Sequence, residues 1–152
     1  MAERLTHLDD RGKIQMVDVS NKPSVRRRAV ARCTFQAAPE TIELIMKGSL
    51  PKGEALVTAR LAGIQAAKRV DVMIPLCHTL PLEHVDVQFS RVESGIEIEA
   101  SAVVTSRTGV EMEALTAASV AALTLWDMTK AVDATLSVTN LELVLKEKDD
   151  SV

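Results

Sequence analysis

The sequence predicts an α+β fold in which helices cover one face of an antiparallel sheet. Segments with strand-like alternation and segments with helical spacing follow one another in the order β-α-α-β-β-α-β. That order is a split β-α-β pattern, typical of a ferredoxin-like sandwich. The other sheet face then needs cover, and because the strands are apolar, we expect a second copy of the chain to supply it. The predicted protein is therefore a ferredoxin-like, oligomeric α+β sandwich.

The N-terminal half of the chain is predicted to contain one strand and two helices. Residues 1–13 are polar, and we expect them to form a flexible N-terminal segment. Apolar and polar side chains then alternate over 25–37, which predicts a strand with one partly solvated face. Pro39 and Gly48 stand where a short helix would begin and end. Small side chains recur at helical spacing over 53–72, which predicts a longer helix.

The C-terminal half is predicted to be a loop, two paired strands, a long helix and a last strand. Two prolines make 74–82 a loop. Alternating apolar side chains predict strands within 85–89 and 96–104, and the serine and glycine between them indicate a hairpin. A helix rich in alanine is predicted over 111–133, and a strand over 136–145.

The composition is that of one globular domain. The chain of 152 residues is long enough for one core, and its 47% hydrophobic and 26% charged residues are typical of folded proteins. We expect a single catalytic α+β domain over 14–146, followed by a polar C-terminal tail over 147–152.

Composition also disfavours several classes of protein. The net charge of -3 and the scattered basic residues disfavour nucleic-acid binding, and an aromatic content of 2% leaves little surface for stacking bases. No apolar run reaches the ~18 residues that span a bilayer, and the N-terminus has no apolar signal core. Cys33 and Cys77 stand far apart, so we expect no disulfide framework and a reducing, cytoplasmic location.

The first candidate site is the proline-bracketed loop that holds Leu76, Cys77 and His78. A loop histidine can exchange protons near neutral pH or contact a phosphate. From spacing alone, a solvated or capping histidine is the simpler explanation. A zinc site is disfavoured because Cys77 and His78 are adjacent and the sequence has no second pair at ligand spacing, so we expect no metal.

Two further candidates lie at opposite ends of the helix predicted over 111–133. Glu111 and Glu113 stand at its N-terminus, where the helix dipole alone explains carboxylates, although one of them could bind a purine-like amidine edge. Asp127 and Lys130 are neighbours near its C-terminus and could shuttle a proton. An exposed ion pair is the structural alternative, but the apolar residues around the pair favour a partly enclosed site.

Scattered cations form the last candidate set, although composition alone indicates solvated surface charges. They are Lys22, Arg26, Arg28, Lys52, Lys68 and Arg69. Lys52 precedes a predicted helix and could aim its ammonium at an anion near that helix end. The surrounding sequence is not a P-loop, so discrete cations would have to hold any polyphosphate.

The length of the predicted helix over 111–133 limits how its two ends can cooperate. Glu113 and Asp127 would stand ~21 Å apart along its axis and within ~40° of the same face. A compact substrate could hardly touch both from one copy of the helix. Either one end alone is functional, or helix ends from two subunits combine, and we favour the second because two-fold pairs bring unlike ends together.

Seven stretches of the sequence together resemble one known family. They are Leu5-Thr6-His7, Met16–Ser20, Lys52-Gly53, Ala59–Lys68, Ile74–His78, Thr108–Thr124 and Asp127–Ala131. In this order they closely resemble the cyclic pyranopterin monophosphate synthase family, the MoaC proteins of molybdenum cofactor biosynthesis. The resemblance covers about residues 5–145, and it is specific because several long strings match.

The resemblance implies an assembly and a reaction. It implies a ferredoxin-like fold assembled as a hexamer, a trimer of dimers, with the active site at a subunit interface. The implied substrate is a small molecule, a cyclised dihydroguanosine triphosphate, and the products are cyclic pyranopterin monophosphate and diphosphate. The implied enzyme is a lyase that needs no metal or organic cofactor.

The resemblance also carries the family's site residues onto matching positions. It assigns catalysis to Asp127, Lys130 and Lys52. It assigns substrate binding to Leu76, Cys77, His78, Glu111, Met112 and Glu113, with Asp18 and Arg26 as supporting positions. Rebuilding the rings requires several proton transfers, and expelling diphosphate requires cations.

The sequence departs from the family pattern at its C-terminal end. Family members end with a lysine- and glycine-rich segment, whereas residues 145–152 contain no glycine. Lys146 or Lys148 would have to stand in for a tail lysine that closes over the substrate. Trp126 stands where a smaller aromatic side chain is usual, and we interpret it as a packing change. The alternatives are a catalytically weak paralogue that binds a nucleotide-like ligand, and a purely structural oligomer.

Overall fold

The computed structural model describes residues 7–150, which contain four helices and four strands. In chain order they are β1 (Val25–Gln36), α1 (Pro39–Met46), α2 (Ala55–Ala67), α3 (Val70–Met73), β2 (His84–Val92), β3 (Gly95–Ser106), α4 (Glu111–Thr129) and β4 (Ser137–Asp149). Residues 1–6 of the predicted N-terminal segment and 151–152 of the predicted tail lie outside the described residues.

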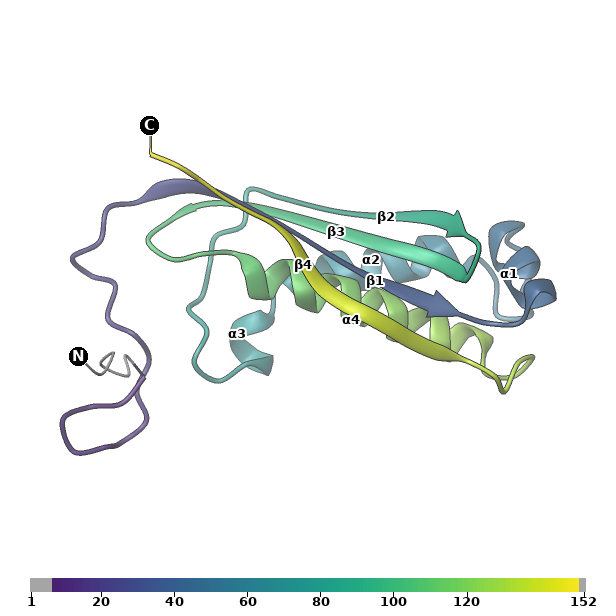
Figure 1. Cartoon of the computed structure of the whole chain (residues 1–152), viewed down its shortest axis with the longest axis horizontal. Coiled ribbons are helices and arrows are strands. Elements are labelled where there is room, and N and C mark those ends of the chain that lie inside the picture. Colours follow the sequence, from purple (N-terminus) through teal and green to yellow (C-terminus); the bar gives the residue numbers. More distant parts are fainter. Residues whose placement is uncertain (1–6, 151–152) are drawn as a thin grey trace.

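The four strands form one sheet in the order β2-β3-β1-β4, and every neighbouring pair is antiparallel. The helix α4 packs against β1 and β3, while α2 packs against β2 and α4. Figure 1 shows α4 running along the length of the sheet. The predicted α+β class, with helices against an antiparallel sheet, is confirmed.

Small side chains let the helices lie close to the sheet. The strand β1 turns Ala29, Ala31 and Cys33 toward α4, and each is at most 1% exposed. The Cys33 thiol donates to the carbonyl oxygen of Ala118 on α4 at 3.6 Å. Dense packing of such small residues replaces the aromatic side chains that this chain lacks.

The sheet face that points away from the helices is mostly polar, which corrects the expectation of an apolar face in need of cover. Alternation along β1 places Arg26, Arg28 and Arg32 there, and the neighbouring residues of β3 include Glu97 and Glu99. Ion pairs link two of these arginines to β4, Arg28 to Glu147 and Arg32 to Glu142. Large exposed apolar side chains occur instead in the helix layer, for example Val57, Leu61 and Leu123.

Two predicted helices are shorter in the structure, for reasons that the residues make clear. The helix expected over 53–72 ends at Ala67, where the N–H of Arg69 bonds to Ala66 and the chain turns to bury Val70. The helix expected over 111–133 ends at Thr129. The residues after it leave the helix and bring a buried aspartate against α1.

The last strand is longer than predicted. It was expected over 136–145, but β4 continues to Asp149 because residues 146–149 pair in register with residues 26–29 of β1. Opposite charges support the extension, as between Arg28 and Glu147 at 3.6 Å. Residues 147–149 therefore pair with the sheet.

Candidate functional site

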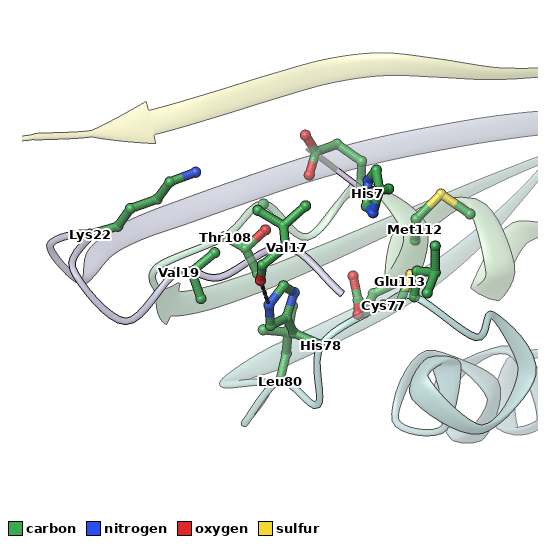
Figure 2. Close-up of a pocket in the computed structure, with 13 residues that line it drawn as sticks. His7, Val17, Val19, Lys22, Cys77, His78, Leu80, Thr108, Met112 and Glu113 are labelled. Carbon is green, nitrogen blue, oxygen red and sulfur yellow. Dashed lines mark hydrogen bonds between the residues drawn. The ribbon is translucent and has the colours of Figure 1, made fainter. Parts of the chain in front are cut away.

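A cavity of about 470 Å³ lies at the N-terminal end of α4. Three segments meet there: the chain before β1, the loop after α3 and the first turn of α4 (Figure 2). The residues that line it are His7, Val17, Val19, Lys22, Leu76, Cys77, His78, Leu80, Thr108, Gly109, Glu111, Met112 and Glu113. All six residues assigned to substrate binding in the loop and on α4 are therefore brought together.

The loop after α3 is held in place by two side-chain hydrogen bonds. His78 Nε2–H donates to the carbonyl oxygen of Val17 at 2.7 Å, which ties the loop to the segment before β1 (Figure 2). The hydroxyl of Thr79 donates to Asp71 Oδ2 at 2.6 Å. These contacts fix the histidine at the wall of the cavity.

Glu113 is the buried acid of this cavity, with 4% of its surface exposed. Burial raises the pKa of its carboxyl group to about 7, and the negative charges of Glu111 and Asp71 act in the same direction. A carboxyl group with such a pKa is partly protonated near neutral pH. It can therefore donate a hydrogen bond as well as accept one.

A lysine from the last strand also reaches the cavity wall. Lys146 Nζ forms an ion pair with Glu111 Oε1, which places a cation beside the cavity lining. Burial, with a contribution from Glu113, raises the pKa of the Cys77 thiol, so this cysteine is held in its neutral form. The cavity thus has a buried acid and a loop histidine in its lining, and Lys146 is paired with Glu111 beside it.

A second cluster of charges lies at the C-terminal end of α4. Lys52 Nζ donates to the carbonyl oxygen of Asp127 at 2.7 Å and lies 3.2 Å from its Oδ2. Lys130 Nζ lies 2.7 Å from Asp127 Oδ1. These lysine contacts lower the pKa of Asp127, with Lys130 making the larger contribution. The three residues assigned to catalysis therefore converge on one another within a single chain.

The two clusters do not meet within one chain. Asp127 follows Glu113 by fourteen residues on the same helix, which corresponds to ~21 Å along its axis. The three catalytic candidates have side chains between 41% and 59% exposed, so the cluster faces outward. The structure therefore places acid and histidine at one end of α4 and the lysine pair at the other.

Two supporting residues predicted from the sequence lie outside the cavity. Asp18 belongs to the segment before β1, and its Oδ1 accepts the backbone N–H of Ser20. The side chain of Ser20, followed by this N–H, lowers the pKa of Asp18 by hydrogen bonding to its carboxylate. Arg26 borders a separate depression of about 290 Å³ on the outer side of β1 and β4. Neither residue lines the cavity, although Val17 and Val19, the two neighbours of Asp18, do.

Sequence reasoning missed part of the cavity wall. His7, Val17, Val19 and Lys22 come from an N-terminal segment that has no regular structure, so no periodicity indicated which side chains would point inward. Lys22 was recognised merely as one of several scattered cations. The contact between His78 and Val17 is what brings this segment over the cavity.

Residues 7–150 contain neither a metal-binding cluster nor a membrane-spanning helix. Within residues 7–150, no three histidine, cysteine, aspartate or glutamate side chains are grouped as a metal site would require. None of the helices in that part of the chain is both long and apolar enough to cross a bilayer. Cys33 and Cys77 are both free thiols.

Comparison with known proteins identifies the family. The MoaC family model matches residues 16–149. A protein of Thermomicrobium roseum called cyclic pyranopterin monophosphate synthase is 53% identical over 148 residues, covering 96% of this chain and 89% of its own length. Proteins of the same name from Chloroflexus aggregans and Oleidesulfovibrio alaskensis are 50% and 49% identical, covering 95% and 96% of this chain and 88% and 93% of their own lengths. The resemblance predicted from the sequence is confirmed, and the chain belongs to the MoaC family.

Proposed function

We propose that this chain is a cyclic pyranopterin monophosphate synthase of molybdenum cofactor biosynthesis. It would act as a lyase in the cytoplasm and convert a cyclised dihydroguanosine triphosphate to cyclic pyranopterin monophosphate and diphosphate. The observation that carries the proposal is similarity along almost the whole chain to relatives that bear this name. The clustering of the matching residues at the two ends of α4 supports it.

We further propose that each active site combines two chains of a ferredoxin-like homo-oligomer, which we expect to be a hexamer built as a trimer of dimers. The ~21 Å between Glu113 and Asp127 on one helix prevents a compact substrate from touching both. A second chain that packs with its helices reversed would bring its own Lys52, Asp127 and Lys130 to the cavity of the first. Each dimer would then hold two equivalent sites.

The chemistry of the two clusters suits different parts of the substrate. In our proposal Lys52, with Arg26, holds the triphosphate and stabilises charge on the departing diphosphate. Asp127 and Lys130 transfer protons to and from the substrate. Glu113 binds the guanine-derived ring, because a buried carboxyl group can both donate and accept. His78 contacts the phosphate or the sugar from the cavity wall.

The unusual tail motivates the alternative of a catalytically weak paralogue. The family's glycine-rich tail is replaced here by a strand that continues to Asp149. Lys146 on this strand nevertheless reaches Glu111 at the cavity, which supports the enzyme. Diphosphate release by the purified protein supplied with the cyclised nucleotide decides between the two, because a binding paralogue would bind the nucleotide without turnover.

Mixing two inactive variants tests the composite site. Lys52→Ala and Glu113→Ala should each lower kcat for diphosphate release by on the order of 100-fold or more. Refolded together, they should recover about a quarter of the wild-type rate, because half of the pairs are mixed and each mixed pair holds one intact site. Lys52→Ala mixed with Lys130→Ala is the matched control. It should recover no activity, because both changes affect the same half of the site.

Two results would contradict this proposal. Retained activity in Lys52→Ala or Lys130→Ala would remove that lysine from the mechanism. Inactivity of the Lys52→Ala and Glu113→Ala mixture, in oligomers verified as mixed by native mass spectrometry, would place both halves of the site in one chain.

A further inference from the structure

Asp133, just beyond the end of α4, connects three elements of the fold through its buried carboxylate. Asp133 is 8% exposed. Its Oδ2 accepts the backbone N–H of Ala38 at 2.8 Å, immediately before α1. Its Oδ1 accepts both the N–H and the hydroxyl of Thr135, each at 2.7 Å, two residues before β4. Thr41 in the first turn of α1 adds a side-chain hydrogen bond.

The contact with α1 supplies a side-chain acceptor at the N-terminus of that helix, where no local side chain provides one. The residue before α1 is Ala38, which has no side-chain acceptor, so no local side chain caps the helix. A carboxylate near a helix N-terminus also interacts favourably with the helix dipole. Asp133 therefore provides a cap from a segment ninety-five residues away in sequence.

The opposite end of α1 leads directly to Lys52 through a short, well-bonded loop. The N–H groups of Gly48 and Ser49 bond to carbonyl oxygens within α1, and the N–H of Gly53 bonds to Leu50. Leu50 is 5% exposed and anchors the loop in the core. The position of α1 therefore determines where the ammonium group of Lys52 lies.

These contacts connect Asp133, α1, Lys52 and Asp127 in a closed ring. The end of α4 connects Asp127 to Asp133, and a hydrogen bond connects Asp133 to the start of α1. The helix α1 and the loop after it lead to Lys52, whose Nζ donates to the carbonyl oxygen of Asp127 at 2.7 Å. Asp133 does not line the cavity around Glu113, and its oxygens already accept hydrogen bonds inside the chain. A direct role in contacting substrate is therefore disfavoured.

We propose that Asp133 is a positioning residue, which holds α1 against the end of α4 and so fixes Lys52 beside Asp127. Its consequence for catalysis rests on the function proposed above. If Lys52 stabilises the departing diphosphate, a displacement of this ammonium by ~1 Å would lower kcat by on the order of 100-fold.

Two substitutions separate the link to α1 from the link to β4. Asp133→Asn can keep an oxygen toward Thr135 but turns an NH₂ group toward the N–H of Ala38, where two donors then face each other. Thr135→Val is the matched control, because it removes one hydrogen bond to Oδ1 and leaves the link to α1 intact. Both variants should be compared with wild type as folded oligomers of equal size.

The first measurement needs no substrate. Trace acetylation followed by mass spectrometry reports how readily each lysine amine reacts, with Lys68 as an internal reference. In Asp133→Asn, Lys52 should react severalfold faster than in wild type, because its ammonium loses its fixed oxygen partners. Thr135→Val should leave the rate of Lys52 unchanged. The second measurement is diphosphate release, where Asp133→Asn should lower kcat with little change in KM.

An unchanged acetylation rate of Lys52 in Asp133→Asn would overturn the proposal, and so would an equal increase in Thr135→Val. If Asp133→Asn does not fold, Thr41→Val removes one bond of the α1 link, and an unchanged Lys52 rate in that variant would overturn it equally. If wild type releases no diphosphate, the proposed function fails, whereas the acetylation rates still decide whether Asp133 positions Lys52.

Discussion

Glu113 is a carboxyl group held out of water, so its ionisation affects both the cavity and the stability of the fold. Burial raises its pKa from an ordinary 4.5 to about 7. The folded chain therefore binds this proton more tightly than the unfolded chain does. The stability that follows is fully present below the unfolded pKa and is lost as the pH rises through the folded pKa.

This loss of stability with rising pH predicts how Glu113→Gln should behave. Glutamine stays neutral at every pH, so the stability of the variant does not fall as the pH rises through the pKa of Glu113. Relative to the variant, the unfolding free energy of wild type should fall by on the order of 3 kcal/mol between about pH 5 and about pH 8. Urea unfolding across this range measures it, with exposed Glu40→Gln as the control that follows wild type. Parallel curves for wild type and Glu113→Gln would show that the group is not held neutral.

Residue types and their order were enough to predict which loop and helix residues would gather, but not how the N-terminal segment would lie. Leu76, Cys77 and His78 were found because their loop is bracketed by prolines and matches a family motif. His7 and Lys22 belong to a segment without periodicity, and a backbone hydrogen bond to His78 places that segment. His7 and residues 16–20 also match family stretches, but such a match does not show which side chains of an irregular segment point into a cavity.

At the scale of elements, the packing of α2 on α4 depends on the absence of a side chain at Gly63. A Cβ atom there would lie 2.8 Å from the carbonyl oxygen of Ala117 and 3.1 Å from Cγ2 of Val87. The first neighbour is backbone of α4 and cannot rotate away. The small-residue stripe along α2 is therefore explained by close helix packing.

Gly63→Ala should accordingly destabilise the fold even though alanine favours helices. The helices would have to separate, and overpacking of this kind costs about 1–3 kcal/mol, which outweighs the ~1 kcal/mol gain in helix propensity. Urea unfolding gives the change in free energy. Lys68→Ala, at the exposed end of the same helix, should stay within about 0.5 kcal/mol of wild type. Equal stability of Gly63→Ala and wild type would mean that α2 and α4 are less closely packed.

The order of the elements was predictable because it depends on local periodicity, whereas the helix ends depend on distant contacts. The helix expected over 111–133 ends at Thr129 because Asp133 leaves it to cap α1. The helix expected over 53–72 stops at Ala67, and burial of Val70 follows the turn. The Asp133 contact is with a residue ninety-five positions away in sequence, and helical spacing alone extended both helices too far.

At the scale of the whole molecule, the helix layer is the apolar surface and the open sheet face is the polar one. Val57 and Leu61 on α2 are 64% and 56% exposed, and Leu123 on α4 is 61% exposed. Leu123 and Asp127 are four residues apart and so share one side of α4. A dimer formed through the helix layer would therefore bury apolar surface and bring the lysine pair to the interface in the same step.

Leu123→Glu tests whether assembly and activity depend on this surface. A charge buried at an interface costs several kcal/mol, so the variant should dissociate into smaller species while keeping its helical circular dichroism. Diphosphate release should be lost with the assembly, because the two halves of each site would separate. Light scattering after size exclusion measures the mass. Thr105→Glu on the polar sheet face is the control and should keep both assembly and activity. A dissociated but active Leu123→Glu would show that one chain holds a complete site.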